Sequence, residues 1–330
     1  MGARVRKTVH LFIRLISLWP LLFSSPAHAS LDDRESEAPA QDYLVHLPLV
    51  ANSQTSEGWL GYVNYYRAMA GLAPVLEDPT WSEGGWLHAR YIVKTDILGH
   101  GEDPGNPWYT PEGAAAAQSS NLSASYDDQS SDESAVDVWM QAPFHAIGIL
   151  DPALHHVGYG SYREADGGLQ MGAALDVIRG LGQIPSSVDF PIQWPGNGTT
   201  VSLTLHWGEN PSPLTSCPGY VAPSGLPILL QVGSGGLIPD VTSTSFEQGN
   251  TALEHCAFDE TSYANPDSSL QSLGRSILAT RDGIVLIPRA PLMPGTTYTV
   301  SVTVDGQNYV WSFTVASTVQ MRGVLEGPVP

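Results

Sequence analysis

The sequence predicts an α+β fold, with a helix-rich N-terminal part followed by an all-β C-terminal part. Apolar residues recur at helical spacing in several segments between residues 56 and 140, whereas residues 296–315 alternate between polar and apolar side chains as a half-buried strand does. The composition changes at Ile184–Pro185, and no useful helical pattern is visible beyond that point. With 330 residues, the chain can form two domains that each bury a core.

Residues 1–29 have the pattern of a secretory signal. A basic start, "MGARVRKTVH", precedes the apolar run "LFIRLISLWPLLF" and the small residues "AHA", after which we expect cleavage at Ala29. Arg14 interrupts the apolar run, which is too short for a good membrane span, and a retained N-terminal anchor is the alternative. Residues 30–54 form an acidic linker whose composition is typical of disorder.

The charge balance argues against nucleic acid as a partner. The formal net charge is −19, and removing residues 1–29 takes away four basic residues and no acidic ones, which leaves 10 Lys and Arg against 33 Asp and Glu, or −23. Phosphate backbones and anionic lipids repel a chain this acidic. Together with the signal, the composition predicts a secreted or cell-surface protein, with no transmembrane helix after the signal is removed.

The two cysteines, Cys217 and Cys256, both lie in the C-terminal part. In an exported protein such a pair is expected to form one disulfide. Two cysteines alone cannot complete a structural zinc site. A catalytic thiol is the alternative.

Three helices are expected in the N-terminal part. The first runs from Ser56 and ends at Gly71, and the second starts with Asp78 as N-cap and Pro79 at the first helical position and continues towards residue 100. Residues 99–113 are rich in Gly and Pro and predict a long ordered loop. Ser130 and Glu133 then form a capping-box pair ahead of the third helix, which bears Val136, Trp139 and Met140.

Two hairpins follow from strand and turn signals. The segments "HHVGYGSY" and "LQMGAALDVI" flank a turn at Asp166–Gly168. Near the C-terminus, alternating residues from Tyr298 to Val304 and from Tyr309 to Val315 flank Asp305–Gly306, a favoured hairpin turn. The second hairpin is typical of a β-sandwich.

The order of four segments resembles the bacterial branch of the CAP superfamily, whose members include cysteine-rich secretory proteins, venom antigen 5 and plant pathogenesis-related proteins. The segments are "NYYRAMAGLAPV", "HARYIVKTDILGH", "VWMQAPFHAIGILDP" and "VGYG". The resemblance implies a three-layer α-β-α sandwich over residues 55–182, with helices on both faces of a small mixed sheet. Residues 185–316 resemble a bacterial immunoglobulin-like module, most clearly in "PLMPGTTYTVSVTVDGQNYVWSFTV", and residues 317–330 form a tail.

The resemblance also implies a cleft, which in better-known members holds two histidines and two glutamates and binds zinc or another divalent cation in several of them. The histidine positions correspond to His100 and His145, whereas His88 is assigned to packing or to the surface. The glutamate positions correspond to Ser120, which precedes Asn121, and to Ala142.

The missing glutamates weaken the case for a metal enzyme. Glu112 is able to supply a carboxylate from the loop, but nothing in the spacing requires it. Two imidazoles alone would hold zinc or another divalent cation weakly, so no certain cofactor is expected. The sequence contains no Gly-x-Ser-x-Gly elbow, and we assign no catalytic residue.

These features favour a secreted, non-catalytic protein. Its cleft would bind a lipid, a glycan or a component of the cell envelope, and its immunoglobulin-like module would act as a spacer or adhesive unit. Two alternatives stay open at this point: a weakly metal-dependent extracellular hydrolase, and a structural adhesin without a small-molecule pocket.

Overall fold

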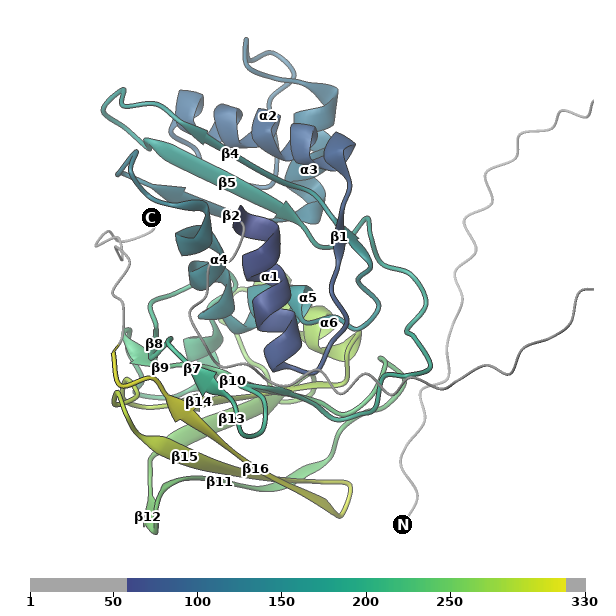
Figure 1. Cartoon of the computed structure of the whole chain (residues 1–330), viewed down its shortest axis with the longest axis vertical. Coiled ribbons are helices and arrows are strands. Elements are labelled where there is room, and N and C mark those ends of the chain that lie inside the picture. The colour runs from purple at the N-terminus through teal and green to yellow at the C-terminus, as the bar shows by residue number, and fades with distance from the viewer. Residues whose placement is uncertain (1–57, 319–330) are drawn as a thin grey trace, which may run out of the picture. The chain divides into compact units, whose positions relative to one another are not determined.

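The computed structural model describes residues 58–318 (Figure 1). The predicted signal, the linker 30–54 and nearly all of the tail 317–330 lie outside the described residues, so these predictions are not tested. Within residues 58–318, no helix combines the length and the apolar character that a membrane span requires.

The N-terminal half is built in three layers, with a small sheet between two groups of helices (Figure 1). The sheet has the order β2-β5-β4, and its strands are β2 (Ser120–Ser125), β5 (Met171–Asp176) and β4 (Tyr159–Arg163). One face carries α2 (Pro79–Thr95) and α3 (Pro111–Ser119), and the other carries α1 (Gly58–Met69), α4 (Asp132–Met140) and α5 (Pro143–Ile149). A separate parallel pair joins β1 (Leu76–Glu77) to β3 (His156–Val157).

Glycines allow α2 to lie directly against the sheet. A Cβ atom at Gly160 would collide with the backbone of Trp86, and one at Gly172 would lie 2.6 Å from the carbonyl oxygen of Ala89. On the helix side, a Cβ atom at Gly85 would lie 2.9 Å from the backbone nitrogen of Gly160. Glycine costs helix propensity, and here it permits close packing between the two layers.

Most of the predicted N-terminal elements are confirmed. Asp78 caps α2 through hydrogen bonds from Thr80 and Trp81, with Pro79 in the first turn, and β4 pairs with β5 as the expected hairpin. The N-cap of α4 is Ser131, not Ser130, because the Ser131 side chain accepts the backbone N–H of Ser134.

Other details of that half differ from the predictions. The second helix ends at Thr95, before residue 100, and the sheet β2-β5-β4 is antiparallel throughout rather than mixed. Helices α3 and α5 were not predicted. Helix α3 begins inside the segment that was expected to be a loop.

The C-terminal half contains two larger sheets. One has the order β13-β14-β10-β6, and its strands are β6 (Ile192–Trp194), β10 (Ile228–Gln231), β13 (His255–Asp259) and β14 (Gly283–Pro288). The other has the order β12-β11-β15-β16-β7, and its strands are β7 (Thr200–Val201), β11 (Val241–Gln248), β12 (Thr251–Ala252), β15 (Thr297–Val304) and β16 (Gln307–Val315). A short antiparallel pair joins β8 (Leu205–His206) to β9 (Ser224–Gly225). The hairpin β15–β16 turns at Asp305 and Gly306, both with positive φ, as predicted.

The prediction of an all-β C-terminal half was wrong in one respect. Helix α6 (Ser268–Ala279) lies within it, capped by the side chain of Asp267. Its Leu270, Leu273 and Ile277 recur at helical spacing, so the pattern was present but short. The disulfide between Cys217 and Cys256 is confirmed, with 5.6 Å between the two Cα atoms.

The hydrophobic core continues from one half into the other. The rings of Tyr66 and Trp194 meet edge to face with 5.3 Å between their centroids, and those of Phe144 and Tyr263 do so at 5.1 Å. The described residues, 58–318, belong to one compact unit. The division into separate domains at residues 182–185 stays a prediction.

Candidate functional site

His145 is held by a carboxylate from the C-terminal half. Its Nδ1 lies 2.7 Å from Oε2 of Glu209, and the Glu209 side chain is 1% exposed. Because a carboxylate only accepts hydrogen bonds, Nδ1 of His145 carries the hydrogen. The imidazole is therefore fixed at one nitrogen, and its side chain keeps 18% of its surface exposed.

The local sequence explains why Glu209 lies where it does. Helix α5 begins with Pro143, and its N-cap, Ala142, has no side chain that could accept a backbone N–H. Glu209 fills this role, since its carboxylate accepts the backbone N–H groups of Phe144 at 3.2 Å and His145 at 3.3 Å. A negative charge near the first turn of a helix is favourable.

Two polar residues of β2 adjoin the same region. Asn121 is buried and donates a hydrogen bond to the carbonyl oxygen of His145 at 3.1 Å. Ser120 is also buried, and within residues 58–318 its Oγ has no hydrogen-bond partner. Ser120 and Asn121, which were expected beside the cleft, are thus buried inside the protein. Asn121 directly positions α5 through its hydrogen bond to His145.

A second histidine, His206, lies close to this pair and is fully buried. Its Nδ1 donates to the carbonyl oxygen of Gln141 at 2.9 Å, and its Nε2 has no partner among the described residues. Burial lowers the pKa of His206 below its usual range; Glu209 opposes this shift and His145 adds to it. The ring is therefore neutral at pH 7. It lines a hollow of about 30 Å³, enough for about one water molecule.

The other predicted histidine, His100, has different surroundings. It is exposed, and its Nδ1 donates to the carbonyl oxygen of Ala117 in α3 at 2.7 Å. Within residues 58–318 no described interaction joins the imidazoles of His100 and His145, so their meeting across a cleft stays a prediction. Glu112 lies exposed in the first turn of α3.

His88, which was assigned to packing or to the surface, is buried on α2. Its Nδ1 lies 2.9 Å from Oε1 of Glu102, and its Nε2 lies 3.0 Å from the carbonyl oxygen of Gly99. Burial lowers the pKa of His88, and the hydrogen bond with Glu102 opposes this effect. The pair anchors the loop that follows α2, because Glu102 also accepts the backbone N–H of Thr110 at 3.0 Å.

These residues do not fit the four-ligand metal site that the family resemblance implies. Ser120 and Ala142 stand at its two glutamate positions. In the part of the chain that the structure describes, no three His, Cys, Asp or Glu side chains are grouped to hold an ion. Glu209 supplies a carboxylate beside His145, but from a different part of the chain and as a hydrogen-bond acceptor.

Comparison with known families agrees with the three-layer arrangement. Residues 60–172 match the CAP family model, described as the cysteine-rich secretory protein family. This match supports the CAP superfamily for the N-terminal half, and no curated protein matches the chain. The bacterial branch and the immunoglobulin-like assignment of residues 185–316 are not tested by the match and stay predictions.

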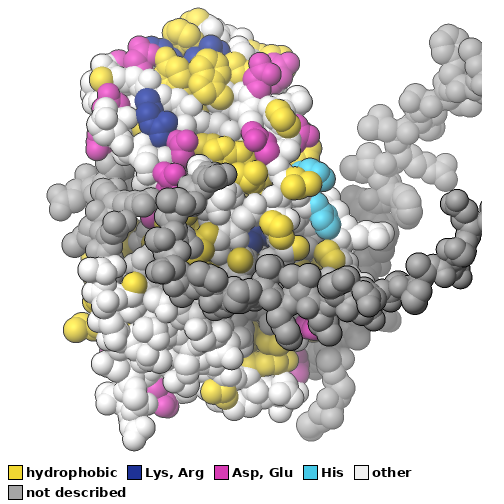
Figure 2. All heavy atoms as spheres, in the orientation of Figure 1, with side chains coloured by type: hydrophobic (Ala, Val, Ile, Leu, Met, Phe, Trp, Pro, Cys, Tyr) yellow, Lys and Arg dark blue, Asp and Glu magenta, His cyan; other side chains and the backbone are white. Residues whose placement is uncertain are grey.

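Sequence reasoning missed Glu209 and His206, because both lie outside the segment that resembles CAP proteins. One signal was available. Between Asp189 and Asp240, Glu209 is the only Asp, Glu, Lys or Arg. On the face shown in Figure 2, charged side chains gather over the N-terminal half and are sparse over the C-terminal half. Glu209 follows His206 by three residues, and a single carboxylate near a histidine in a segment otherwise without charged residues is a candidate for a specific buried role.

Proposed function

We propose that this protein is a non-catalytic, secreted or cell-surface protein whose CAP half binds a lipid, a glycan or another envelope component. The CAP match suggests a non-catalytic domain of an extracellular type in general. Residues 185–316 would act as an immunoglobulin-like spacer or adhesive module. The confirmed disulfide agrees with an oxidising compartment.

The observation that carries the binding proposal is the fixed imidazole of His145. Glu209 holds Nδ1, and Asn121 holds the backbone of the same residue, so the ring is oriented before any ligand arrives. Its Nε2 is then the nitrogen left to meet a ligand, at the part of the side chain that remains exposed. Pre-oriented polar groups of this kind reduce the ordering cost of binding.

The same geometry gives little support to metal-dependent hydrolysis. A catalytic zinc normally has three protein ligands and an open position. The residues at the cleft positions supply two histidines, and one nitrogen of each is already engaged by Ala117 or Glu209.

The binding proposal is tested with the exported protein, using vesicles made of lipids from its own envelope and the soluble envelope polysaccharide as separate probes. We expect one probe to bind, and His145→Ala to weaken that binding about tenfold or more, as loss of an oriented polar contact does. His156→Ala, which changes an exposed histidine of β3, is the matched control. Failure of both probes to bind, or an equal effect of the two variants, would refute the proposal.

A second candidate function rests on the 2.7 Å contact between His145 and Glu209. A carboxylate that orients an imidazole is the arrangement of a general base, and a metal-dependent hydrolase is able to use one. Ester and casein substrates, assayed with and without a chelator, test this alternative. Activity that is lost in both His145→Ala and Glu209→Gln would establish it, and activity that persists in both would exclude it.

A further inference from the structure

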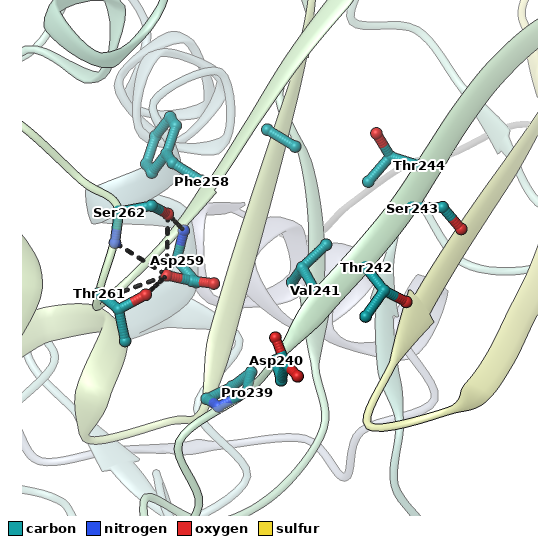
Figure 3. Close-up of a pocket in the computed structure, with 11 residues that line it drawn as sticks. Pro239, Asp240, Val241, Thr242, Ser243, Thr244, Phe258, Asp259, Thr261 and Ser262 are labelled. Atoms are coloured by element: carbon teal, nitrogen blue, oxygen red, sulfur yellow. Dashed lines mark hydrogen bonds between the residues drawn. The ribbon is translucent and has the colours of Figure 1, made fainter.

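A hollow of about 420 Å³ lies in the C-terminal half, between β11 and β13 (Figure 3). Its volume falls within the range of small-molecule sites, about 300–1,000 Å³. The lining comes from residues 239–244 on one side and from residues 257–259, 261 and 262 on the other. None of them belongs to the His145 site, so this hollow is independent of the function proposed for the CAP half.

The polar centre of the hollow is Asp259, at the end of β13. This residue is 5% exposed. Its Oδ1 accepts four hydrogen bonds, from the backbone and hydroxyl groups of Thr261 and Ser262. These bonds fix the carboxyl group, and Oδ2 points away from them towards the hollow (Figure 3). No described residue hydrogen-bonds to Oδ2. This oxygen is therefore open to accept a hydrogen bond from a ligand that carries a donor group.

The rest of the lining adds negative charge and hydroxyl groups. Asp240 supplies a second carboxylate, immediately before β11, and Thr242, Ser243 and Thr244 follow along that strand. The hydroxyl groups of Thr242 and Ser243 already donate to Thr303, and that of Thr244 contacts His255, so the two carboxylates are the main polar groups for a ligand. The lining contains no Lys, Arg or His, and the whole chain has a net charge of −19. The hollow therefore disfavours anions and favours a cationic group that donates several hydrogen bonds.

An apolar part lies beside these polar groups. Val241 is half-buried and Pro239 is buried, whereas the ring of Phe258 packs away from the hollow, against Phe144 and Tyr263. A methylene chain that packs against Val241 would remove apolar surface from water, which favours binding. The ligand that matches both parts is a short alkyl chain with a positive charge at its end.

We propose that this hollow binds an alkyl chain that ends in a primary ammonium group, as in a lysine side chain or a free diamine. The ammonium donates to Oδ2 of Asp259 and lies near the carboxylate of Asp240, and the methylene groups pack on Val241. An ammonium group has three donors, which suits a lining made of carboxylates and hydroxyls.

Two other ligands fit less well. Calcium takes 6–8 oxygen ligands, and the hollow offers two carboxylates in a space much larger than an ion. A neutral sugar has donors for Asp259, but it would leave the two carboxylates without a balancing charge. Both ligands are included in the test.

The test uses the full exported protein and calorimetric titration with defined probes. Cadaverine represents a free diamine, and Nα-acetyl-lysine methylamide represents a lysine side chain in a peptide. We expect at least one of them to bind, more weakly at high salt, and whichever binds more tightly identifies the source. The matching norleucine methylamide, which lacks the ammonium group, is expected not to bind. Binding of norleucine to the same extent, or of calcium or cellobiose in place of both amines, would overturn the proposal.

Variants then place the binding in the hollow. Asp259→Asn keeps an oxygen that can accept from Thr261 and Ser262 but turns an amide NH₂ towards the ligand, and we expect affinity to fall about tenfold or more. Asp240→Asn, at an exposed position, is the second variant should Asp259→Asn fail to fold, and we expect a several-fold loss. Asp189→Asn removes one charge from an exposed position outside the hollow and is the control. An equal affinity in all three variants would place the binding elsewhere and refute the proposal.

Discussion

Replacing Glu209 by alanine removes three hydrogen bonds between the C-terminal half and helix α5. The carboxylate contacts His145 Nδ1 at 2.7 Å and the backbone N–H groups of Phe144 at 3.2 Å and His145 at 3.3 Å. It is also 1% exposed, so water cannot readily replace it. We therefore expect Glu209→Ala to lower the free energy of unfolding.

The magnitude follows from the contact lengths. The contact at 2.7 Å has the length of a charge-assisted hydrogen bond, which contributes about 1.5–3 kcal/mol. The two longer backbone contacts act as a helix cap, whose loss costs about 1 kcal/mol. The sum is a loss of about 2.5–4 kcal/mol. Glu209→Gln keeps an oxygen acceptor but no charge, and we expect it to lose about half of that amount.

Urea unfolding of the wild type and the variants measures these differences. The control is Glu254→Ala, which makes the same change in a pair with Arg289 whose side chains are 62% and 49% exposed. Exposed pairs contribute less than about 1 kcal/mol. A double-mutant cycle with His145→Ala should give a coupling energy of about 1–2 kcal/mol. The reasoning fails if Glu209→Ala costs no more than Glu254→Ala.

Three further predictions concern stability. Because burial lowers the pKa of His206, the unfolded chain binds a proton below about pH 6.5 that the folded chain does not, so the free energy of unfolding should fall as the pH drops below 6.5. In urea titrations at pH 7.5 and 5.5, His206→Asn should reduce the difference in the free energy of unfolding between the two pH values. The pH dependence that remains is assigned to His88, whose pKa is also lowered by burial. A pH dependence equal to that of the wild type would contradict the prediction. Arg67 is buried, its pKa is lowered to about 10 by burial, and it donates to four backbone carbonyls. Arg67→Lys should cost about 2–4 kcal/mol in the same assay, because a lysine cannot reach several of these carbonyls at once; a loss below about 1 kcal/mol would show that the carbonyls find other partners. The disulfide between Cys217 and Cys256, 39 residues apart, should contribute about 4 kcal/mol by limiting the unfolded chain, measured by replacing both cysteines with alanine; unchanged stability would argue against this entropic account.

The elements that were predicted correctly carry their signals within a few residues. Asp78 and Pro79 start α2 by capping and by a fixed φ angle, and Asp305–Gly306 closes the hairpin β15–β16 with two positive φ angles. These features depend on neighbours along the chain, so the sequence contains what is needed to predict them.

The missed helices show where local patterns become insufficient. Helix α3 is capped by Thr110 and begins with Pro111, but its interior is largely alanine and offers no contrast between an apolar and a polar face. Helix α5 has only seven residues and is buried on nearly all sides, which removes the same contrast. Helices of this kind are held mainly by packing, and isolated short helices are marginal in water.

The sequence by itself determined helices α1, α2 and α4, the two hairpins, the disulfide, and the resemblance that led to His100 and His145. Only the tertiary structure decided that Glu209 caps α5 and holds His145, across a separation of 64 residues. The same holds for Asp240, just before β11, and Asp259, at the end of β13, which line one hollow although β11 and β13 belong to different sheets. Hydrophobic spacing and capping rules describe interactions between residues within about four positions of each other. Glu209 and His145, and likewise Asp240 and Asp259, come together only because distant buried surfaces pack and because buried polar groups need hydrogen-bond partners from any part of the chain.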